Sequence, residues 1–288
     1  MQRACKKQCR AKINLSIDVL SRLPNGYHSV RMVMIRVNIF DTLSIELRDD
    51  GAVRVRSDSA GMPEGRDNLA VRAAEAFFER AGIKDSGCDI FIEKRIPMGA
   101  GMAGGSADAA GVINGLNELF GGVLTLKERM ELGAALGADI PYCIHGGSVL
   151  AEGIGEVLTP LGRLPELWYV IAKPGRSVST KWVYENLDFT RKPSGLDIDG
   201  LTAAIRQGSP DDMFKNMGNV LENAAIKVCP EIADYKREFL QLGADFAMMS
   251  GSGSAVFGVF KDKEAAEYAY RNFEINGMEG KWLTAQAE

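Results

Sequence analysis

The first third of the chain alternates apolar and polar residues with the period of two that is typical of β-strands. Over residues 11–20, Ile13 and Leu15 fall on one face of the predicted strand, whereas Lys12 and Asn14 fall on the other. A Leu-Pro-Asn-Gly turn then reverses the chain. Further strand-like stretches cover residues 32–39, 43–47 and 52–55. The pattern therefore predicts an antiparallel β-sheet at the start of the chain.

Helical periodicity begins after residue 67. Asn68 is a favourable N-cap residue, and apolar residues then recur at helical spacing until Gly82. Thr125 and Glu128 form a capping box for a later helix that ends near Gly137. The other elements predicted in this region are a strand at 88–93, a helix of small residues from about 107 to 119, and a strand at 147–151.

The pattern changes near residue 160, and we expect a domain boundary there, between residues 1–160 and 161–288. Two short strands are predicted on either side of the glycine-serine cluster at 250–254, which we term the second glycine loop. The remaining predicted elements are a strand at 168–172, helical segments within 201–242, a helix at 263–272 and a strand at 281–285. Because strands and helices are mixed in both halves, the order predicts a two-domain α+β fold.

Composition narrows the class of protein. A chain of 288 residues that is 46% hydrophobic can bury a sizeable core, and its net charge of -4 gives no reason to expect a nucleic-acid partner. The five scattered cysteines favour free thiols in a reducing cytoplasm over disulfides. No apolar run is long enough to cross a bilayer. The basic first ten residues are expected to be a short, partly disordered leader.

A glycine-rich stretch between a predicted strand and a predicted helix is the most informative motif. Backbone N–H groups and the helix dipole at such a place favour a bound phosphate. Part of the stretch matches the Gly-x-Gly-x-x-Gly dinucleotide fingerprint, but a helix starts where that fold requires a strand ending in an acidic residue. A Walker loop is excluded because no Gly-Lys-Ser/Thr follows, and a tight turn without a ligand is the remaining alternative. This first glycine loop consists of Pro97, Met98, Gly99, Ala100, Gly101, Met102, Ala103, Gly104, Gly105, Ser106 and Ala107.

Three other features could act together with this loop. The second glycine loop is either an ordinary hairpin turn or a second set of backbone amides around an anion. Lys12 is either a solvated lysine or a functional ammonium group, and Asp139 is either a helix N-cap or a functional carboxylate. A carboxylate that accepts a hydroxyl proton and an ammonium group that offsets phosphoryl charge both suit phosphoryl transfer. We therefore expect a kinase that acts on a small-molecule alcohol.

Taken together, these segments resemble the superfamily of small-molecule kinases named for galactose, homoserine, mevalonate and phosphomevalonate, the GHMP kinases. The stretches that carry the resemblance are residues 11–15, 25–28, 97–107, 136–141, 151–156 and 249–254. Since they run in the family's order, the resemblance covers almost the whole chain. It implies an N-terminal domain like domain 2 of ribosomal protein S5 and a ferredoxin-like C-terminal domain.

The resemblance also implies roles for individual residues. Asp139 would be the general base, and Lys12 would orient Asp139 and stabilise the transition state. The first glycine loop would wrap the ATP phosphates. Residues expected to line the nucleotide pocket are Asn68, Lys94 and Asp108, and those expected to bind the substrate are Asn14, Tyr27, His28, Tyr184, Gly251, Ser252 and Gly253. Of these, Tyr27 and Tyr184 would sandwich a cytosine ring, and His28 would bond to its polar edge.

The implied substrate is a cytidine diphosphate-linked methylerythritol, phosphorylated on its 2-hydroxyl group on the non-mevalonate route to isoprenoid precursors. Magnesium is expected with ATP, and Ser106 is a candidate ligand for it. Two departures from the family pattern, Ala100 and Ala107, fall where main-chain N–H groups make most phosphate contacts. We expect a cytoplasmic monomer or weak homodimer with neither a nucleic-acid nor a membrane partner.

Two alternatives stay open at the level of the sequence. One keeps the superfamily and changes the acceptor to homoserine, mevalonate or a sugar, although Tyr27, His28 and Tyr184 favour a nucleobase. The other is a non-catalytic sensor that binds ATP and a metabolite. Retention of both Lys12 and Asp139 disfavours a sensor, which needs neither residue.

Overall fold

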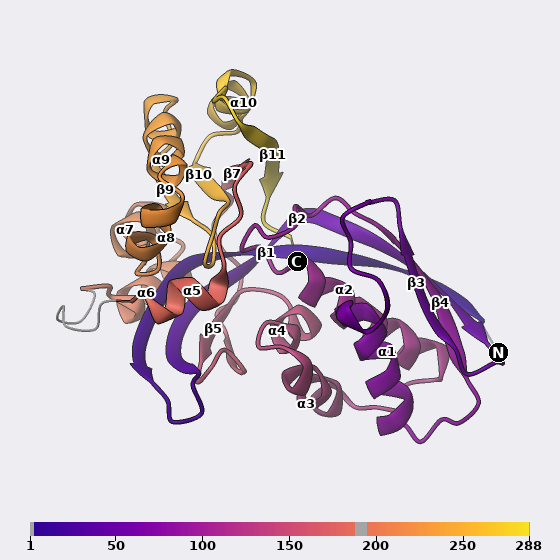
Figure 1. Ribbon diagram of the computed structural model, residues 1–288. Helices are drawn as coiled ribbons and strands as arrows, with labels where there is room; N and C mark the ends of the chain where they lie inside the picture. The colour runs from indigo at the N-terminus through magenta and orange to yellow at the C-terminus, as the bar shows by residue number, and fades with distance from the viewer. Residues whose placement is uncertain (1–2, 188–194, 288) are drawn as a thin grey trace. The chain divides into compact units, whose positions relative to one another are not determined.

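The structure, a computed structural model, describes residues 3–187 and 195–287 (Figure 1). The chain forms two compact units, each assembled from three segments. Unit 1 comprises Met1–Ala11, Ile39–Met98 and Ala103–Gly146, and unit 2 comprises Lys12–Asn38, Gly99–Met102 and Gly147–Glu288. Two long strands, β1 (Ala4–Arg22) and β2 (His28–Arg48), contribute to both units. The predicted division at residue 160 concerns the family's domains and stays a prediction.

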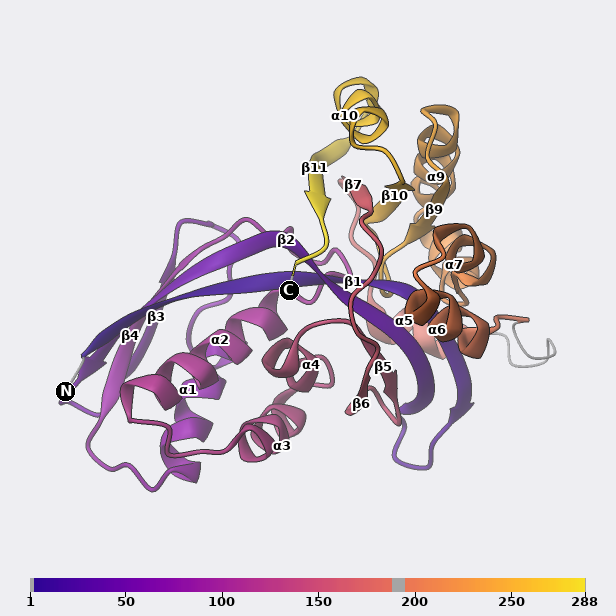
Figure 2. The same cartoon turned by 180° about the vertical axis from the view of Figure 1, so that it is seen from behind.

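Unit 1 is a sheet with helices on one face (Figure 2). Strand β4 (Gly87–Glu93) pairs antiparallel with β2 and parallel with β3 (Val53–Ser57). A short 3-10 helix (Gly65–Asp67) precedes α1. The helices of unit 1 are α1 (Leu69–Arg80), α2 (Gly104–Leu119), α3 (Leu126–Leu136) and α4 (Ile140–His145).

Helix α2 lies directly against the first strand. A Cβ atom on Gly111 would be 2.1 Å from the Sγ atom of Cys9, and one on Gly115 would be 3.1 Å from the Sγ atom of Cys5. Both cysteines are buried, so the alternating pattern of the strand starts well before residue 11. The expected disordered leader is therefore wrong for residues 4–10, which pair within the sheet because α2 covers their apolar side.

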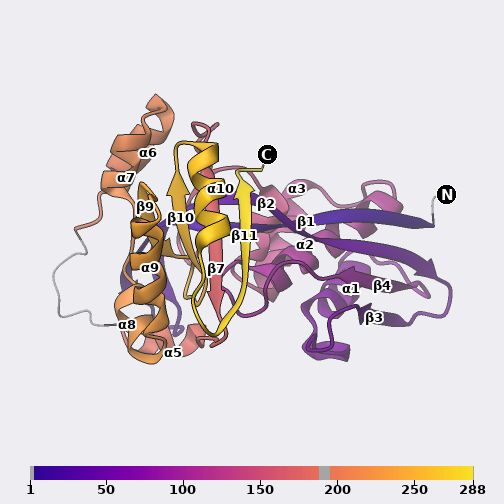
Figure 3. The same cartoon turned by 90° about the horizontal axis from the view of Figure 1, so that it is seen from above.

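Unit 2 contains a second, antiparallel sheet, whose strands lie in the order β11 (Met278–Ala285), β7 (Trp168–Pro174), β10 (Val256–Phe260) and β9 (Phe246–Met249). Helices α9 and α10 pack against it (Figure 3), as expected for a ferredoxin-like domain. The strands of unit 2 are β5 (Val149–Glu152), β6 (Val157–Pro160), β7 (Trp168–Pro174), β8 (Gly218–Asn219), β9 (Phe246–Met249), β10 (Val256–Phe260) and β11 (Met278–Ala285). Its helices are α5 (Thr180–Glu185), α6 (Ile198–Gln207), α7 (Pro210–Asn216), α8 (Glu222–Val228), α9 (Glu231–Gln241) and α10 (Lys263–Asn272).

Local sequence signals placed several element ends correctly. The side chain of Asn68 accepts from the N–H of Ala70 at the start of α1, and the capping box of Thr125 and Glu128 opens α3. The helix at 263–272 has the predicted bounds. Two predictions were wrong: the strands expected at 32–39 and 43–47 are one strand, and α2 begins three residues before the expected start.

The polar side of β1 is also buried, which its alternation did not indicate. Lys12 is 4% exposed, and Asn14 and Ser16 are fully buried. A strand with polar residues on one face ordinarily turns that face to water. Burying these groups costs free energy unless they are bonded, so their partners matter for function. Among the described residues, no helix is both long and apolar enough to span a membrane.

Candidate active site

The first glycine loop contains several residues in the left-handed backbone conformation that glycine favours. Gly99 and Gly101 have positive φ angles of 62° and 73°, and Ala103 has φ 58° at the N-cap of α2. The loop thus delivers the chain into the N-terminus of a 16-residue helix, whose first N–H groups have no partner within the helix. Gly104 does not have positive φ, so the left-handed positions all precede α2.

The tip of this loop, residues 99–102, is held by its carbonyl oxygens. The N–H of Ala255 donates to the oxygen of Ala100 at 3.2 Å, and the hydroxyl of Ser250 donates to the oxygen of Gly101 at 3.1 Å. The N–H of Lys12 donates to the oxygen of Met102 at 3.2 Å. Three consecutive carbonyl groups are therefore bonded within unit 2, while the N–H edge of the tip takes no part in these bonds.

The two glycine loops touch backbone to backbone. A Cβ atom on Gly101 would lie 2.1 Å from the oxygen of Ser250, and one on Gly251 would lie 2.6 Å from the oxygen of Gly101. Real Cβ atoms do not approach other atoms so closely. The glycines at 101 and 251 are therefore needed for the contact itself, which an ordinary hairpin turn would not require.

The second glycine loop is fixed by side chains from other parts of unit 2. The amide group of Asn219 donates to the carbonyl oxygens of Met249 and Gly251 at 2.9 and 2.8 Å. The hydroxyl of Ser252 lies 2.7 Å from that of Thr180, at the start of α5. Sequence analysis missed Asn219, because a lone asparagine between two helical segments carries no signal of a partner 30 residues away.

Lys12 and Asn14 form a buried polar pair. The Nζ atom of Lys12 donates to the Oδ1 atom of Asn14 at 2.6 Å, and Asn14 in turn contacts the sulfur of Met32. The interpretation of Lys12 as a solvated strand lysine is therefore wrong. A buried ammonium group bonded to a neutral amide still calls for an anion, which a phosphate or a carboxylate can supply.

Asp139 occupies the N-cap position of α4, but its side chain does not cap the helix. Its carbonyl oxygen accepts from the N–H of Cys143 at 3.0 Å, while its carboxylate is not used in this way. The alternative that Asp139 serves as a capping residue thus loses its physical basis. Lys12 and Asp139 belong to different units, and their pairing stays a prediction.

The residues expected around the nucleotide have structural partners in unit 1. Asn68 caps α1 and also donates to the carbonyl oxygen of Pro63 at 2.9 Å. Lys94 bonds to Asp41 at 2.5 Å and to Asp108 at 2.8 Å. Both carboxylates are buried, and burial together with the charge of Asp41 raises the pKa of Asp108 to about 7 despite the opposing effect of Lys94. Sequence analysis identified Lys94 and Asp108 but not Asp41.

Two of the three rings expected around a nucleobase, those of His28 and Tyr184, lie close to each other. His28 and Tyr184 lie with ring centroids 5.1 Å apart and planes tilted by 39°. Tyr27 is 56% exposed, which leaves its ring accessible to a ligand. Burial, and to a lesser extent the charge of Arg22, lowers the pKa of His28 below its ordinary value. The lowered pKa favours the neutral imidazole, which can accept as well as donate a hydrogen bond.

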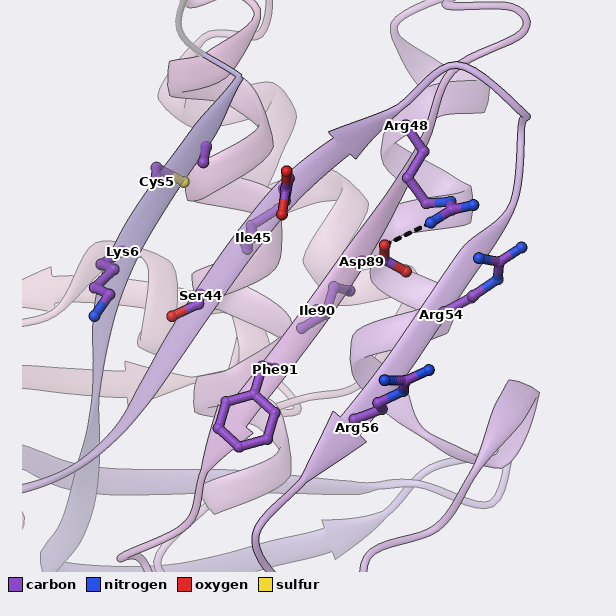
Figure 4. Close-up of a pocket in the computed structure, with 12 residues that line it drawn as sticks. Cys5, Lys6, Ser44, Ile45, Arg48, Arg54, Arg56, Asp89, Ile90 and Phe91 are labelled. Atoms are coloured by element: carbon purple, nitrogen blue, oxygen red, sulfur yellow. Dashed lines mark hydrogen bonds and ion pairs between the residues drawn. The ribbon is translucent and has the colours of Figure 1, made fainter.

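A separate hollow of about 590 Å³ lies on the sheet of unit 1 (Figure 4). Arg54, Arg56 and Phe91 line it, but none of the predicted site residues does. Arg48, which also lines the hollow, forms an ion pair with Asp89 at 2.6 Å, and this pair neutralises part of the positive charge of the hollow. The hollow therefore has weaker support as an active site than the two glycine loops.

The described residues contain no group of three or more histidine, cysteine or acidic side chains that could hold a metal ion. Magnesium that accompanies ATP is bound mainly by phosphate oxygens and needs only one or two protein ligands. Ser106, in the first turn of α2, can supply a hydroxyl oxygen as one such ligand. Its role as a ligand stays a prediction.

Two protein-family models match the chain, GHMP kinases N terminal domain over residues 68–147 and GHMP kinases C terminal over residues 201–277. The chain is 46% identical to the 4-diphosphocytidyl-2-C-methyl-D-erythritol kinase of Alkaliphilus metalliredigens, with 92% of this chain and 91% of the relative covered. It is 44% identical to the protein of the same name from Lachnoclostridium phytofermentans, with coverage of 94% and 92%.

Solved structures agree with these relatives. The crystal structure of a 4-(cytidine 5'-diphospho)-2C-methyl-D-erythritol kinase matches with a TM-score of 0.81 at 32% identity, covering 99% of this chain and 100% of that one. A homoserine kinase from Cytophaga hutchinsonii matches with a TM-score of 0.73 at 21% identity, covering 100% and 95%, which shows a shared fold.

The contact between the two glycine loops predicts a difference between two glycine-to-alanine variants. Gly251→Ala introduces left-handed strain and a clash, so we expect it to lower the free energy of unfolding by about 2–4 kcal/mol. Gly121→Ala is the control, because Gly121 has φ 74° with no atom near its Cβ position. The control should lose only about 1–2 kcal/mol. Urea unfolding measures both values, and equal losses would contradict the loop contact.

Proposed function

Because the chain belongs to the GHMP kinases and, among them, to the 4-diphosphocytidyl-2-C-methyl-D-erythritol kinases, we propose that it phosphorylates the 2-hydroxyl group of that substrate with ATP. The reaction is a step of the non-mevalonate (MEP) route to isoprenoid precursors. The observation that carries the proposal is the packing of two glycine loops against each other. Such an arrangement offers two sets of backbone amides, one for the ATP phosphates and one for the diphosphate of the substrate.

Bonding at the loop tip supports phosphate binding by the first loop. Three successive carbonyl oxygens, from Ala100 to Met102, already have donors, so the N–H groups are the polar groups left for an anion. They precede the positive end of the α2 dipole, which favours negative charge. Magnesium, when bound with ATP, neutralises charge on the β- and γ-phosphates, and Ser106 would be its protein ligand.

Lys12 and Asp139 are the proposed catalytic residues. Asp139 accepts the proton of the 2-hydroxyl group as the oxygen attacks the γ-phosphorus and ADP leaves. Lys12 orients Asp139 and offsets the charge that develops on the transferred group. Asn14 supports this role because its amide oxygen orients the ammonium group, and its own position suits contact with the erythritol chain.

The cytidine end of the substrate is assigned to Tyr27, His28 and Tyr184. The proximity of the His28 and Tyr184 rings supports a shared pocket, in which Tyr27 and Tyr184 stack on the base. Ser252 links the second glycine loop to the helix that carries Tyr184, so diphosphate and base contacts are connected. The loop of Gly251, Ser252 and Gly253 would hold the diphosphate, mainly through the N–H groups of Gly251 and Ser252, because that of Gly253 already donates to the oxygen of Ser250 at 3.0 Å.

The setting of the reaction is part of the proposal. We infer a cytoplasmic enzyme that acts as a monomer or weak homodimer, without a nucleic-acid or membrane partner. The five buried, free cysteines support a reducing compartment.

An assay for ADP release with the cytidyl substrate, homoserine, mevalonate and galactose tests the proposed activity. Release with the cytidyl substrate alone is expected, and release with another acceptor in its place would overturn the proposal.

The assignment of the general base predicts a loss of turnover without a loss of stability. Asp139→Asn should lower kcat roughly 10²–10⁴-fold, because the amide cannot accept the hydroxyl proton. Lys12→Ala should show a similar loss, and the double variant should lose far less than the product. Since the carboxylate does not cap α4, the Tm of Asp139→Asn should stay at the wild-type value. Near-normal kcat in Asp139→Asn would remove Asp139 from the mechanism.

Stacking on the base predicts a selective loss of substrate binding. A stacked ring contributes about 1–3 kcal/mol per base, so Tyr184→Ala should raise the Kd of the cytidyl substrate roughly ten- to a hundredfold without changing that of ATP. Tyr268→Ala, at an exposed tyrosine of α10, is the matched control. Competition experiments should show stronger inhibition by CMP and CDP than by UMP and UDP. Equal inhibition by both pairs would contradict a cytosine pocket.

The lowered pKa of His28 predicts a pH dependence of substrate binding. The neutral ring persists from pH 8 to below its ordinary pKa of about 6.5, so the KM for the cytidyl substrate should be constant over that range and rise at lower pH. Because folding lowers the pKa of His28, the folded protein favours the neutral ring. The stability that this contributes is fully present above the pKa of the unfolded chain and is lost as the pH falls through the pKa of the folded protein. His28→Gln cannot be protonated, and its KM profile should be flat. A rise in both proteins would assign the effect to another group.

A further inference from the structure

Asp41 is a buried carboxylate on β2, where the other residues on the same face from Val33 to Leu47 are apolar. It lies on β2 between Ile39 and Leu43, whose side chains point to the same side, and it is fully buried. Its Oδ1 atom accepts from the N–H groups of Arg95 and Ile96 at 2.5 and 2.8 Å. These two amides belong to the segment that leads from β4 directly into the first glycine loop.

The other oxygen of Asp41 is connected to the far end of the loop. It bonds to the Nζ atom of Lys94 at 2.5 Å, and the same atom bonds to Asp108 on α2 at 2.8 Å. A Cβ atom placed on Gly104 would be 3.5 Å from this ammonium group, so Lys94 lies directly beside the first residue of the helix. The chain before the loop and the helix after it are therefore joined through Asp41 and Lys94.

We propose that Asp41 is a positioning residue for the nucleotide, which fixes both ends of the first glycine loop in the conformation that binds the ATP phosphates. The inference rests on the proposed role of this loop. A loop with glycines at 99, 101, 104 and 105 has many conformations available, and holding it in one of them costs conformational entropy. Asp41 fixes the loop in the folded protein before ATP binds, so less conformational entropy is lost on binding and the affinity for ATP increases.

The test is the variant Asp41→Asn, which keeps an oxygen for the two amides and removes one of the two negative charges that hold Lys94. The Kd and the KM for ATP should rise about 10- to 100-fold, because small displacements of positioned groups have effects of this size. The KM for the cytidyl substrate should not change. A purely structural role would instead lower the amount of folded enzyme and leave both KM values as they are.

Two variants control for loss of charge and for loss of packing in the same sheet. Asp89→Asn removes a carboxylate from an ion pair on β4 that does not touch the segment 94–96. Ile45→Val removes a buried methyl group from β2. Neither should alter the KM for ATP. An unchanged KM in folded Asp41→Asn, with wild-type enzyme that binds ATP normally, would overturn the positioning role and leave the proposed function intact.

Amide hydrogen exchange on the nucleotide-free wild type gives an independent test if Asp41→Asn does not fold. The amides of Arg95 and Ile96 should exchange slowly, as bonded and buried groups do. Fast exchange at both would overturn the proposal. Wild-type enzyme that fails to bind ATP would overturn the role of the loop itself, and this inference with it.

Discussion

The meeting of two glycine loops without any side chain between them is the constraint on which the rest of the site depends. Gly101 and Gly251 approach so closely that a Cβ atom on either would overlap a carbonyl oxygen of the other loop. The carbonyl groups of the first loop consequently face the contact and are bonded there, which leaves the N–H groups of that loop for a ligand. Contact between main chain and main chain places the two proposed phosphate-binding loops side by side, with no side chain between them.

Glycine permits this conformation but does not select it. Selection comes from polar side chains elsewhere in the chain, namely Asn219 for the second loop and Asp41 for the first. Each is buried, and each bonds through one side-chain polar atom to two backbone groups of the loop or of the segment beside it. Burying such groups is favourable only when their bonds are made, so their cost in stability is linked to the geometry of the site.

Features that depend on near neighbours could be predicted from the sequence. The cap at Asn68, the capping box at Thr125 and the helix at 263–272 are determined by residues within one turn of them. The strand character of residues 4–10 could not be predicted in this way, because it depends on α2, about 100 residues later. The GHMP fold was predicted because the resemblance used the order of motifs along almost the whole chain.

The missed residues differ in how visible they were. Asp41 occupies a core position in the alternation of Ile39, Leu43 and Ile45, and an acid on a buried strand face signals a bonded, specific role. Because residues 32–39 and 43–47 were predicted as separate strands, Asp41 fell between them and its position on a buried strand face was missed. Asn219 had no such signal, since its two carbonyl partners can be recognised only once β8 lies beside β9. A polar residue that interrupts an apolar period is thus a better guide to a positioning role than an isolated polar residue in a connecting segment.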